Sequence, residues 1–458
     1  MASFSKQLSV PLPINNNDPS FSKMNSFSEN SDFVASAHVD DNASTSPRST
    51  LDELPVARPD RHIWGIYIAL CIISLVELYS ASSREVASSA IGVYGPILRH
   101  GAMLLAGLGI ILLLQRIHYR NFWWMTPIFA FVSVIMMVYV IFFGDVVNGA
   151  RRSFSLLGVT MQPSEFLKLS AAAMIALVMS LSQLRGTVKL SGVIICASIV
   201  LIFAGMLAPQ GLTNTLLLMA ISLSMMLISG ISVKRLVAVM GIYAIGGAFL
   251  LIIHHFLSDG DGILGRWDVW VSRVSQFLGD GTPKYAEKLT SDNAQEMYSY
   301  MAQAHGGIFG VLPGNSRETA RLPLAFSDYI YSIIVEDLGF VGGVVVILLY
   351  IWLLGRASAI ASKCSRAFPA LLVIAMALTI AFQAFFHIAI VTGVFPVSGQ
   401  PLPLISKGGT SILITSIAFG VMLSVSRYAV RSGRRRDIKA EMESLPEEAR
   451  AQNPAQLS

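Results

Sequence analysis

PALLVIAMALTIAFQAFFHIAIV, residues 369–391, contains no aspartate, glutamate, lysine or arginine. A helix of this length rises through about 35 Å, and the hydrocarbon core of a bilayer is about 30 Å thick. The stretch therefore predicts a helix that spans a membrane. Similar apolar stretches recur along the chain and bring the predicted spans to ten, at about residues 63–83, 96–114, 122–143, 164–182, 190–208, 212–229, 236–256, 329–354, 369–391 and 411–430.

The composition favours the same class of protein. Of the 458 residues, 53% are hydrophobic and 13% are charged, whereas soluble domains carry roughly 25% charged residues. The mean hydropathy is +0.61. Such a chain has too few polar side chains to cover a surface exposed to water. We therefore expect an all-α integral membrane protein, a bundle of ten helices with one large extracytoplasmic loop between helices 7 and 8.

The charges in the loops alternate along the chain, as membrane orientation requires. Every second connection carries basic residues and no acids: Arg116 and Arg120; Arg185 and Lys189; Lys234 and Arg235; Arg356, Lys363 and Arg366. The other connections hold most of the acids. This alternation predicts a multi-pass protein of the cytoplasmic membrane with both termini in the cytoplasm. It also accounts for the net charge of +5 without nucleic acid as a partner.

The ends of the chain differ from its centre. Residues 1–60 are rich in Ser, Asn, Asp and Pro without a signal-peptide pattern, and we expect a disordered cytoplasmic extension. Residues 61–430 form the membrane domain. Residues 431–458 are a basic, then polar cytoplasmic tail, either orientation charge with disorder or a site for anionic membrane lipids.

Three outer segments contain more residues than simple connections need. They are residues 144–163, residues 257–328 and the Gly- and Pro-rich residues 392–410. Irregular backbone at membrane depth is stable only when it is buried in protein or lines a wet cavity. We therefore expect all three segments to converge on one outward-facing cavity.

Four charged residues lie beside the fourth span. Glu165 and Lys168 are three residues apart, so they can meet on one helix face. They are either a cavity pair for an anionic substrate or a structural ion pair at a helix start. Arg151 and Arg152 precede that helix, and arginine forks match phosphate oxygens. The alternative is a loop-locking contact with Asp145 or with a lipid phosphate.

Two further candidates lie in the other outer segments. Asp328 sits where the large loop meets the eighth span and could accept a proton from a substrate. An N-cap role is equally compatible with its position. In the Gly-rich turn ISKGGTS, Lys407 follows Ser406 and could bind an anion, or could extend its ammonium group to the membrane surface as structural lysines do.

Five segments of the sequence resemble the SEDS family, which includes FtsW, RodA and SpoVE. They are YSASS (79–83), NGARRSFSLLGVTMQPSEFLKL (148–169), GGIFGVLPGNS (306–316), LPLAFSDYIYSIIVEDLGFVGG (322–343) and VTGVFPVSGQPLPLISKGGTSIL (391–413). The resemblance extends from about residue 60 to about residue 430, in the order of the family. Five motifs in the order of the family indicate this family far more specifically than any single motif does.

The resemblance implies an activity. Members of the family are peptidoglycan glycosyltransferases that polymerise lipid II, an undecaprenyl diphosphate-linked glycan. They work with a class B penicillin-binding protein, a transpeptidase. The long N-terminal extension favours an FtsW-like role at the division septum, with divisome proteins as partners, over a RodA-like elongation role. The main rival is a lipid II flippase, and a weaker one is a scaffold for the penicillin-binding protein.

The resemblance also implies site residues. The essential acid of the family falls on Asp328, which would act as general base. The QPSE-x-x-K element runs from Gln162 to Lys168 and includes Glu165, and the basic pair falls on Arg151 and Arg152. The expected substrate-binding residues are therefore Arg151, Arg152, Gln162, Glu165, Lys168, Ser406 and Lys407.

The sequence departs from the family pattern at several places. Leu324 and Phe326 replace a glutamate and a histidine, Gln210 replaces an acid, and Lys407 replaces a tyrosine. The first two changes weaken the case for a metal site near Asp328. No cofactor is evident, and the sequence gives a divalent cation no support.

Overall fold

The computed structural model describes residues 58–81, 94–147, 150–156, 159–184, 187–257, 275, 277, 289–290, 293–319, 321–322 and 326–444. Nearly all of the expected N-terminal extension lies outside the described residues. So do residues 445–458 of the tail and most of the first half of the large loop.

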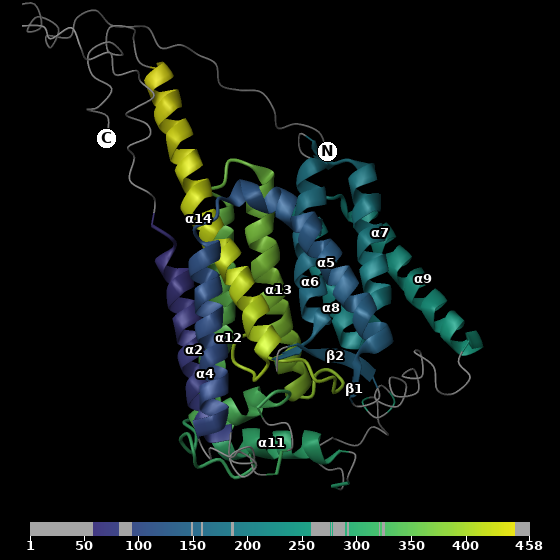
Figure 1. Cartoon of the computed structure of the whole chain (residues 1–458), viewed down its shortest axis with the longest axis vertical. Helices are drawn as coiled ribbons and strands as arrows, with labels where there is room; N and C mark the ends of the chain where they lie inside the picture. Colours follow the sequence, from purple (N-terminus) through teal and green to yellow (C-terminus); the bar gives the residue numbers. More distant parts are fainter. Residues whose placement is uncertain are drawn as a thin grey trace, which may run out of the picture. The chain divides into compact units, whose positions relative to one another are not determined.

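Helices make up most of the described chain (Figure 1). They are α2 (Arg61–Ala81), α4 (Tyr94–Leu114), α5 (Phe122–Phe143), α6 (Pro163–Leu181), α7 (Leu190–Leu207), α8 (Leu212–Ile228), α9 (Val233–Leu257), α11 (Ala294–Gly306), α12 (Ile330–Ala361), α13 (Ala367–Val391) and α14 (Gly409–Ser444). The strands are β1 (Asp145–Val147), β2 (Ala150–Leu156), β3 (Val159–Met161), β4 (Gln183–Leu184) and β5 (Thr187–Val188).

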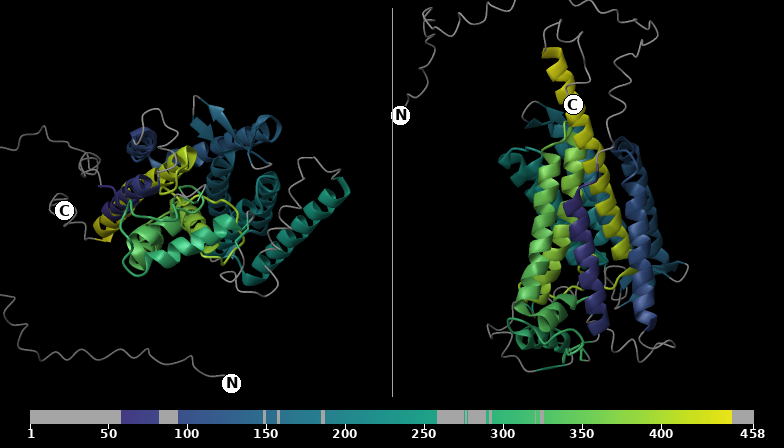
Figure 2. Two further views of the ribbon diagram at one scale, coloured as in Figure 1. Left: turned by 90° about the horizontal axis from the view of Figure 1, so that it is seen from below. Right: turned by 90° about the vertical axis from the view of Figure 1, so that its left-hand side faces the viewer.

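The bundle of apolar helices confirms the predicted fold class. Among the described residues, eight helices are long and apolar enough to cross a membrane: α2, α4, α5, α6, α7, α12, α13 and α14. The remaining two predicted spans fall on the 17-residue α8 and the 25-residue α9. Most of the long helices run side by side in Figure 1 and in the right-hand view of Figure 2, and α11 lies across the end at which α12 begins. The number of spans and their orientation stay predictions.

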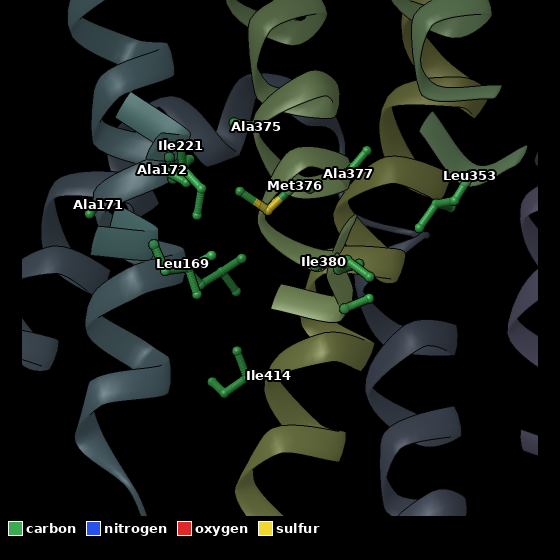
Figure 3. Close-up of a cluster of buried hydrophobic side chains, with 14 of the residues drawn as sticks. Leu169, Ala171, Ala172, Ile221, Leu353, Ala375, Met376, Ala377, Ile380 and Ile414 are labelled. Carbon is green, nitrogen blue, oxygen red and sulfur yellow. The ribbon is translucent and has the colours of Figure 1, made fainter. Parts of the chain in front are cut away.

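The helices α6, α13 and α14 form the centre of the bundle, because they are the most buried of the candidate spans. The helices α6 and α13 are in contact, and both contain buried alanines: Ala171 and Ala172 lie on α6, and Ala375 and Ala377 lie on α13 (Figure 3). Alanine lets two helix backbones approach closely, which favours association within a membrane. Large apolar side chains such as Leu105 and Phe131 are exposed on the outside of the bundle.

A small antiparallel sheet occupies residues 145–161, in the order β1-β2-β3. In β2, Ala150 pairs with Val147, and Leu156 pairs with Val159. Each pairing leaves a two-residue connection, the common length for a hairpin. The sheet lies at the same end of the bundle as α11 (Figure 1).

The helix α12 is interrupted at Gly339, whose φ of +71° is outside the helical range. Four backbone hydrogen bonds join residues 307–312 to residues 336–341 at this break. The approach is so close that a Cβ at Gly306, Gly310 or Gly339 would collide with backbone atoms. Glycine is required here because the chain of the large loop packs directly into a broken helix.

Residues 392–408 fold back into the bundle, and residues 402–406 are buried. Side chains of three helices satisfy the carbonyl groups of this segment, as buried polar backbone requires. The donor atoms are Ser74 Oγ to Ile405 (3.1 Å), Tyr350 Oη to Pro403 (2.6 Å), Gln383 Nε2 to Pro401 (3.3 Å) and His387 Nδ1 to Gln400 (2.6 Å). The segment is therefore fixed at a defined depth.

Candidate functional site

Two adjacent pockets share one wall, formed by Gln162, Gly399 and Pro401. The first, which we call the Asp328 pocket, has a volume of about 280 Å³ and contains Asp328 and Lys407 in its lining. All three outer segments contribute to it, because Thr160 and Gln162 come from the first, Ser327 and Asp328 from the second, and Gly399, Pro401 and residues 407–410 from the third. The three segments therefore meet at one pocket, and that this pocket faces outward stays a prediction.

The second cavity, which we call the Arg152 pocket, is lined by Arg152 and Glu165 on one side. Gln210, Asn214 and residues 396–401 complete it. Arg152 and Glu165 are the charged residues in its lining, and the other lining residues are uncharged polar or apolar, such as Leu212 and Val397. The two pockets together form one polar region between α6, α14 and the segment 392–408.

The half-buried Asp328 is positioned by its neighbours in sequence. The Ser406 hydroxyl donates to the carbonyl of Ser327 at 2.8 Å, and the Lys407 backbone N–H donates to the carbonyl of Phe326 at 3.0 Å. On the other side, a Cβ at Gly399 would lie 3.0 Å from Asp328 Oδ2. The carboxylate therefore lies between two parts of the segment 392–408.

The predicted pair of Glu165 and Lys168 meets, with 2.7 Å between Lys168 Nζ and Glu165 Oε1. Lys168 is 0% exposed, so its ammonium group does not reach a substrate in either pocket. Gln383 of α13 donates to the other Glu165 oxygen at 3.2 Å and also to Pro401. The pair therefore joins the start of α6 to the shared wall of the two pockets.

The structure separates the two predicted arginines. Successive side chains of a strand point to opposite faces, and Arg151 and Arg152 are neighbours in β2. The exposed Arg151 donates to the carbonyls of Phe142 and Ile141 at the end of α5. Arg152 instead lines its own pocket. The two side chains do not face one cavity together.

Ser406 has no exposed surface, and its hydroxyl accepts a hydrogen bond from the Leu402 N–H at 2.7 Å. Because it also donates to Ser327, it connects the buried segment to the residue before Asp328. Lys407 has its Nζ 5.2 Å from the centroid of the Phe326 ring. Burial lowers the pKa of Lys407 below the ordinary lysine value.

Sequence reasoning missed Arg99 and His100, which lie in the first turns of α4 and line the Asp328 pocket. The buried His100 lies 2.7 Å from the Ser74 hydroxyl, which in turn donates to Ile405. One signal was available, because a basic residue on a predicted outer side opposes the orientation rule, as Arg151 and Arg152 also do.

Several buried acids line neither pocket. Glu336 accepts hydrogen bonds from Ser316 Oγ and from the N–H groups of Arg317 and Glu318, so it anchors the large loop to α12. Glu77 and Asp337 are buried within the bundle. Within the described part of the chain, no group of three or more His, Cys, Asp or Glu side chains could hold a metal ion.

Residues 60–431 match the family model of cell cycle proteins that is named for FtsW, RodA and SpoVE. This chain belongs to that family. The match confirms the resemblance carried by the five motifs, and it covers the membrane domain from the start of α2 into α14.

Curated relatives agree with the match. The probable peptidoglycan glycosyltransferase FtsW of Bacillus subtilis is 31% identical over 79% of this chain and 89% of its own length. The peptidoglycan glycosyltransferase MrdB of Escherichia coli is 29% identical over 79% of this chain and 92% of its own.

Solved structures share the fold. A chain from a peptidoglycan synthase complex that coordinates polymerization and crosslinking has a TM-score of 0.62 at 23% identity, covering 81% of this chain and 98% of its own. The rod shape determining protein RodA of Thermus thermophilus has a TM-score of 0.56 at 22% identity, covering 81% of this chain and 97% of its own.

Proposed function

We propose that this chain is a peptidoglycan glycosyltransferase that polymerises lipid II during septal wall synthesis. The observation that carries the proposal is the half-buried carboxylate of Asp328 in a cavity that also contains two cations, Arg99 and Lys407. The names of the curated relatives support this class of activity.

The chemistry follows from the substrate. The 4-hydroxyl of one lipid II molecule attacks the anomeric carbon of the growing glycan, and the bond from that carbon to the diphosphate oxygen breaks. Asp328 takes the hydroxyl proton as the new bond forms. The diphosphate leaves with the bonding electrons and needs positive charge beside it. Attack from the face opposite the leaving group inverts the anomeric carbon.

The other expected residues have distinct parts in this proposal. Arg152 would contact the substrate from its own pocket, whereas the exposed Arg151 lines neither pocket and would meet substrate outside them. Gln162 lies in the wall common to both pockets, where it can contact substrate on either side. Glu165, Lys168 and Ser406 are positioning residues, since their polar groups are buried and bonded within the protein.

The proposed partners follow from the fold. A chain of similar fold occurs in a peptidoglycan synthase complex, so we expect this chain to work with a class B penicillin-binding protein and with divisome proteins. The expected location is the cytoplasmic membrane at the division septum, with both termini in the cytoplasm. Elongation in the manner of RodA is the alternative within the family.

A lipid II flippase is the alternative from another class, because a polar region inside a helix bundle also suits transport. Position discriminates between the two. A carrier needs its charges near the midplane, whereas Asp328 lies at the start of α12, at the end of the bundle where α11 lies. This position favours the enzyme.

The test is a polymerisation assay with purified full-length protein, labelled lipid II, and gel separation of glycan products. We expect glycan strands with a co-purified class B penicillin-binding protein, and a comparison without it measures the dependence on that partner. If lipid II instead crosses liposome membranes while no glycan forms under either condition, the transferase proposal is wrong. The absence of both activities would favour a scaffold.

A further inference from the structure

The long helix α14 begins at the Asp328 pocket. The pocket lining includes Gly408, the residue just before this 36-residue helix, and three residues of its first turn, Gly409, Thr410 and Ser411. The first N–H groups of an α-helix have no partner within the helix, and the helix dipole adds partial positive charge at this end. A helix start of this kind favours a bound anion.

A buried hydroxyl supports the same interpretation. Ser411 is 2% exposed, and its Oγ has no hydrogen-bond partner among the described residues. Most buried polar side chains are hydrogen-bonded, so an unsatisfied one needs an explanation. Its place in the pocket lining means that a ligand oxygen can supply the missing bond.

The charged residues of the pocket complete the pattern. Among the described residues, its lining contains Arg99 and Lys407 as cations and Asp328 as an acid. Lys407 directly precedes the turn into α14, and Arg99 approaches from α4. Guanidinium and ammonium groups bind phosphate oxygens through charge-assisted hydrogen bonds. Lys168 does not serve this purpose, because it is buried against Glu165.

We propose that the start of α14, together with Arg99 and Lys407, binds the diphosphate of the isoprenoid-linked donor. This inference rests on the proposed transferase function and assigns the leaving group to the pocket of the base. Base and leaving group must both lie within a few ångströms of the anomeric carbon during an in-line displacement, as effective catalysis by positioning requires. The shared pocket satisfies this condition. Arg152 then remains for other parts of the two substrates.

Equilibrium binding tests the inference without turnover. The full-length protein in detergent is titrated with a fluorescently labelled farnesyl diphosphate. We expect Arg99→Gln and Lys407→Gln each to weaken binding about tenfold or more, because each removes a charge-assisted hydrogen bond. Ser411→Ala should weaken it a few-fold, and Lys407→Arg should retain it. The control is Lys363→Gln, which removes an exposed cation from the loop between α12 and α13 and should bind like wild type.

Competitors identify the source of the bound group. Inorganic pyrophosphate and undecaprenyl diphosphate should displace the probe, and farnesyl monophosphate should displace it at least tenfold less well. Equal displacement by phosphatidylglycerol would indicate a site for lipid headgroups and overturn the inference. Unchanged affinity in the folded Arg99, Lys407 and Ser411 variants would overturn it as well.

The outcome is separable from that of the proposed function. If the wild-type protein polymerises lipid II while these variants bind the probe normally, the transferase stands and the diphosphate site is wrong. If the wild-type protein binds the probe through these residues but forms no glycan, the site stands and the transferase is wrong.

Discussion

Asp328 is held by its backbone neighbours. Ser406 and Lys407 bond to the carbonyls of Ser327 and Phe326, and Gly399 packs against the carboxylate itself. These contacts come from residues more than 70 positions away in sequence. The sequence therefore indicates which acid matters through family resemblance, whereas its orientation is determined by tertiary contacts that no local pattern contains.

Lys407 makes diphosphate binding depend on pH. Burial lowers the pKa of Lys407. In the free protein, Lys407 therefore loses its positive charge at a lower pH than an ordinary lysine does. Diphosphate affinity should therefore fall as the pH rises through the lowered pKa. Lys407→Arg should remove this decline, because arginine stays charged. Titrations of both proteins from neutral to alkaline pH test it, and identical declines would contradict the role of Lys407.

The buried pair of Glu165 and Lys168 predicts a pattern of stability. Lys168→Met leaves a buried carboxylate without its cation and should destabilise the fold by about 3–5 kcal/mol. The double variant with Glu165→Gln should recover most of that loss. Thermal unfolding of the purified proteins measures both changes. If Lys168→Met is as stable as wild type, Lys168 does not compensate the buried charge of Glu165.

The same double variant separates positioning from direct substrate contact. If Lys168 acts only through Glu165, the stable double variant should keep most of its polymerisation rate. A folded double variant without activity would instead indicate that one of the two side chains contacts substrate.

At the scale of elements, the break in α12 is the most demanding feature. Gly310 has a φ of +80°, and a Cβ there would collide with the backbone at Asp337. Gly310→Ala should destabilise the protein by about 1–3 kcal/mol, the usual cost of a strained backbone. The control is Gly355→Ala within α12, where an added Cβ meets no atom within 4 Å. Equal unfolding temperatures for the two variants would contradict this interpretation of the break.

Helix positions were largely predictable from hydropathy, and the smaller elements were not. Predicted ends lie within three residues of the observed ends except at the C-termini of α12 and α14. Good helix formers such as arginine, lysine and glutamate continue α14 to Ser444, beyond the apolar span. The sheet at residues 145–161 was missed, although Asn148-Gly149 in the sequence is a hairpin signal.

For the whole molecule, the apolar spans predict a bundle but not its arrangement. The hydropathy of the spans does not distinguish the central helices α6, α13 and α14, which are the most buried candidate spans, from the outer ones. The convergence of three outer segments followed from the cost of unsatisfied backbone in a membrane. The same argument does not predict that the polar region is divided into two pockets, because this division depends on the depth at which residues 392–408 are fixed.

The central claim is that the Asp328 carboxylate removes the proton of the attacking sugar hydroxyl. The most direct test compares glycan formation from labelled lipid II by wild type, Asp328→Asn and Glu296→Gln, each folded and partner-bound. Glu296 is an acid of α11 that lines neither pocket. Loss of the base should lower the rate about 10²–10⁴-fold, while the Glu296 variant keeps the wild-type rate. Polymerisation by Asp328→Asn at the wild-type rate would contradict the claim.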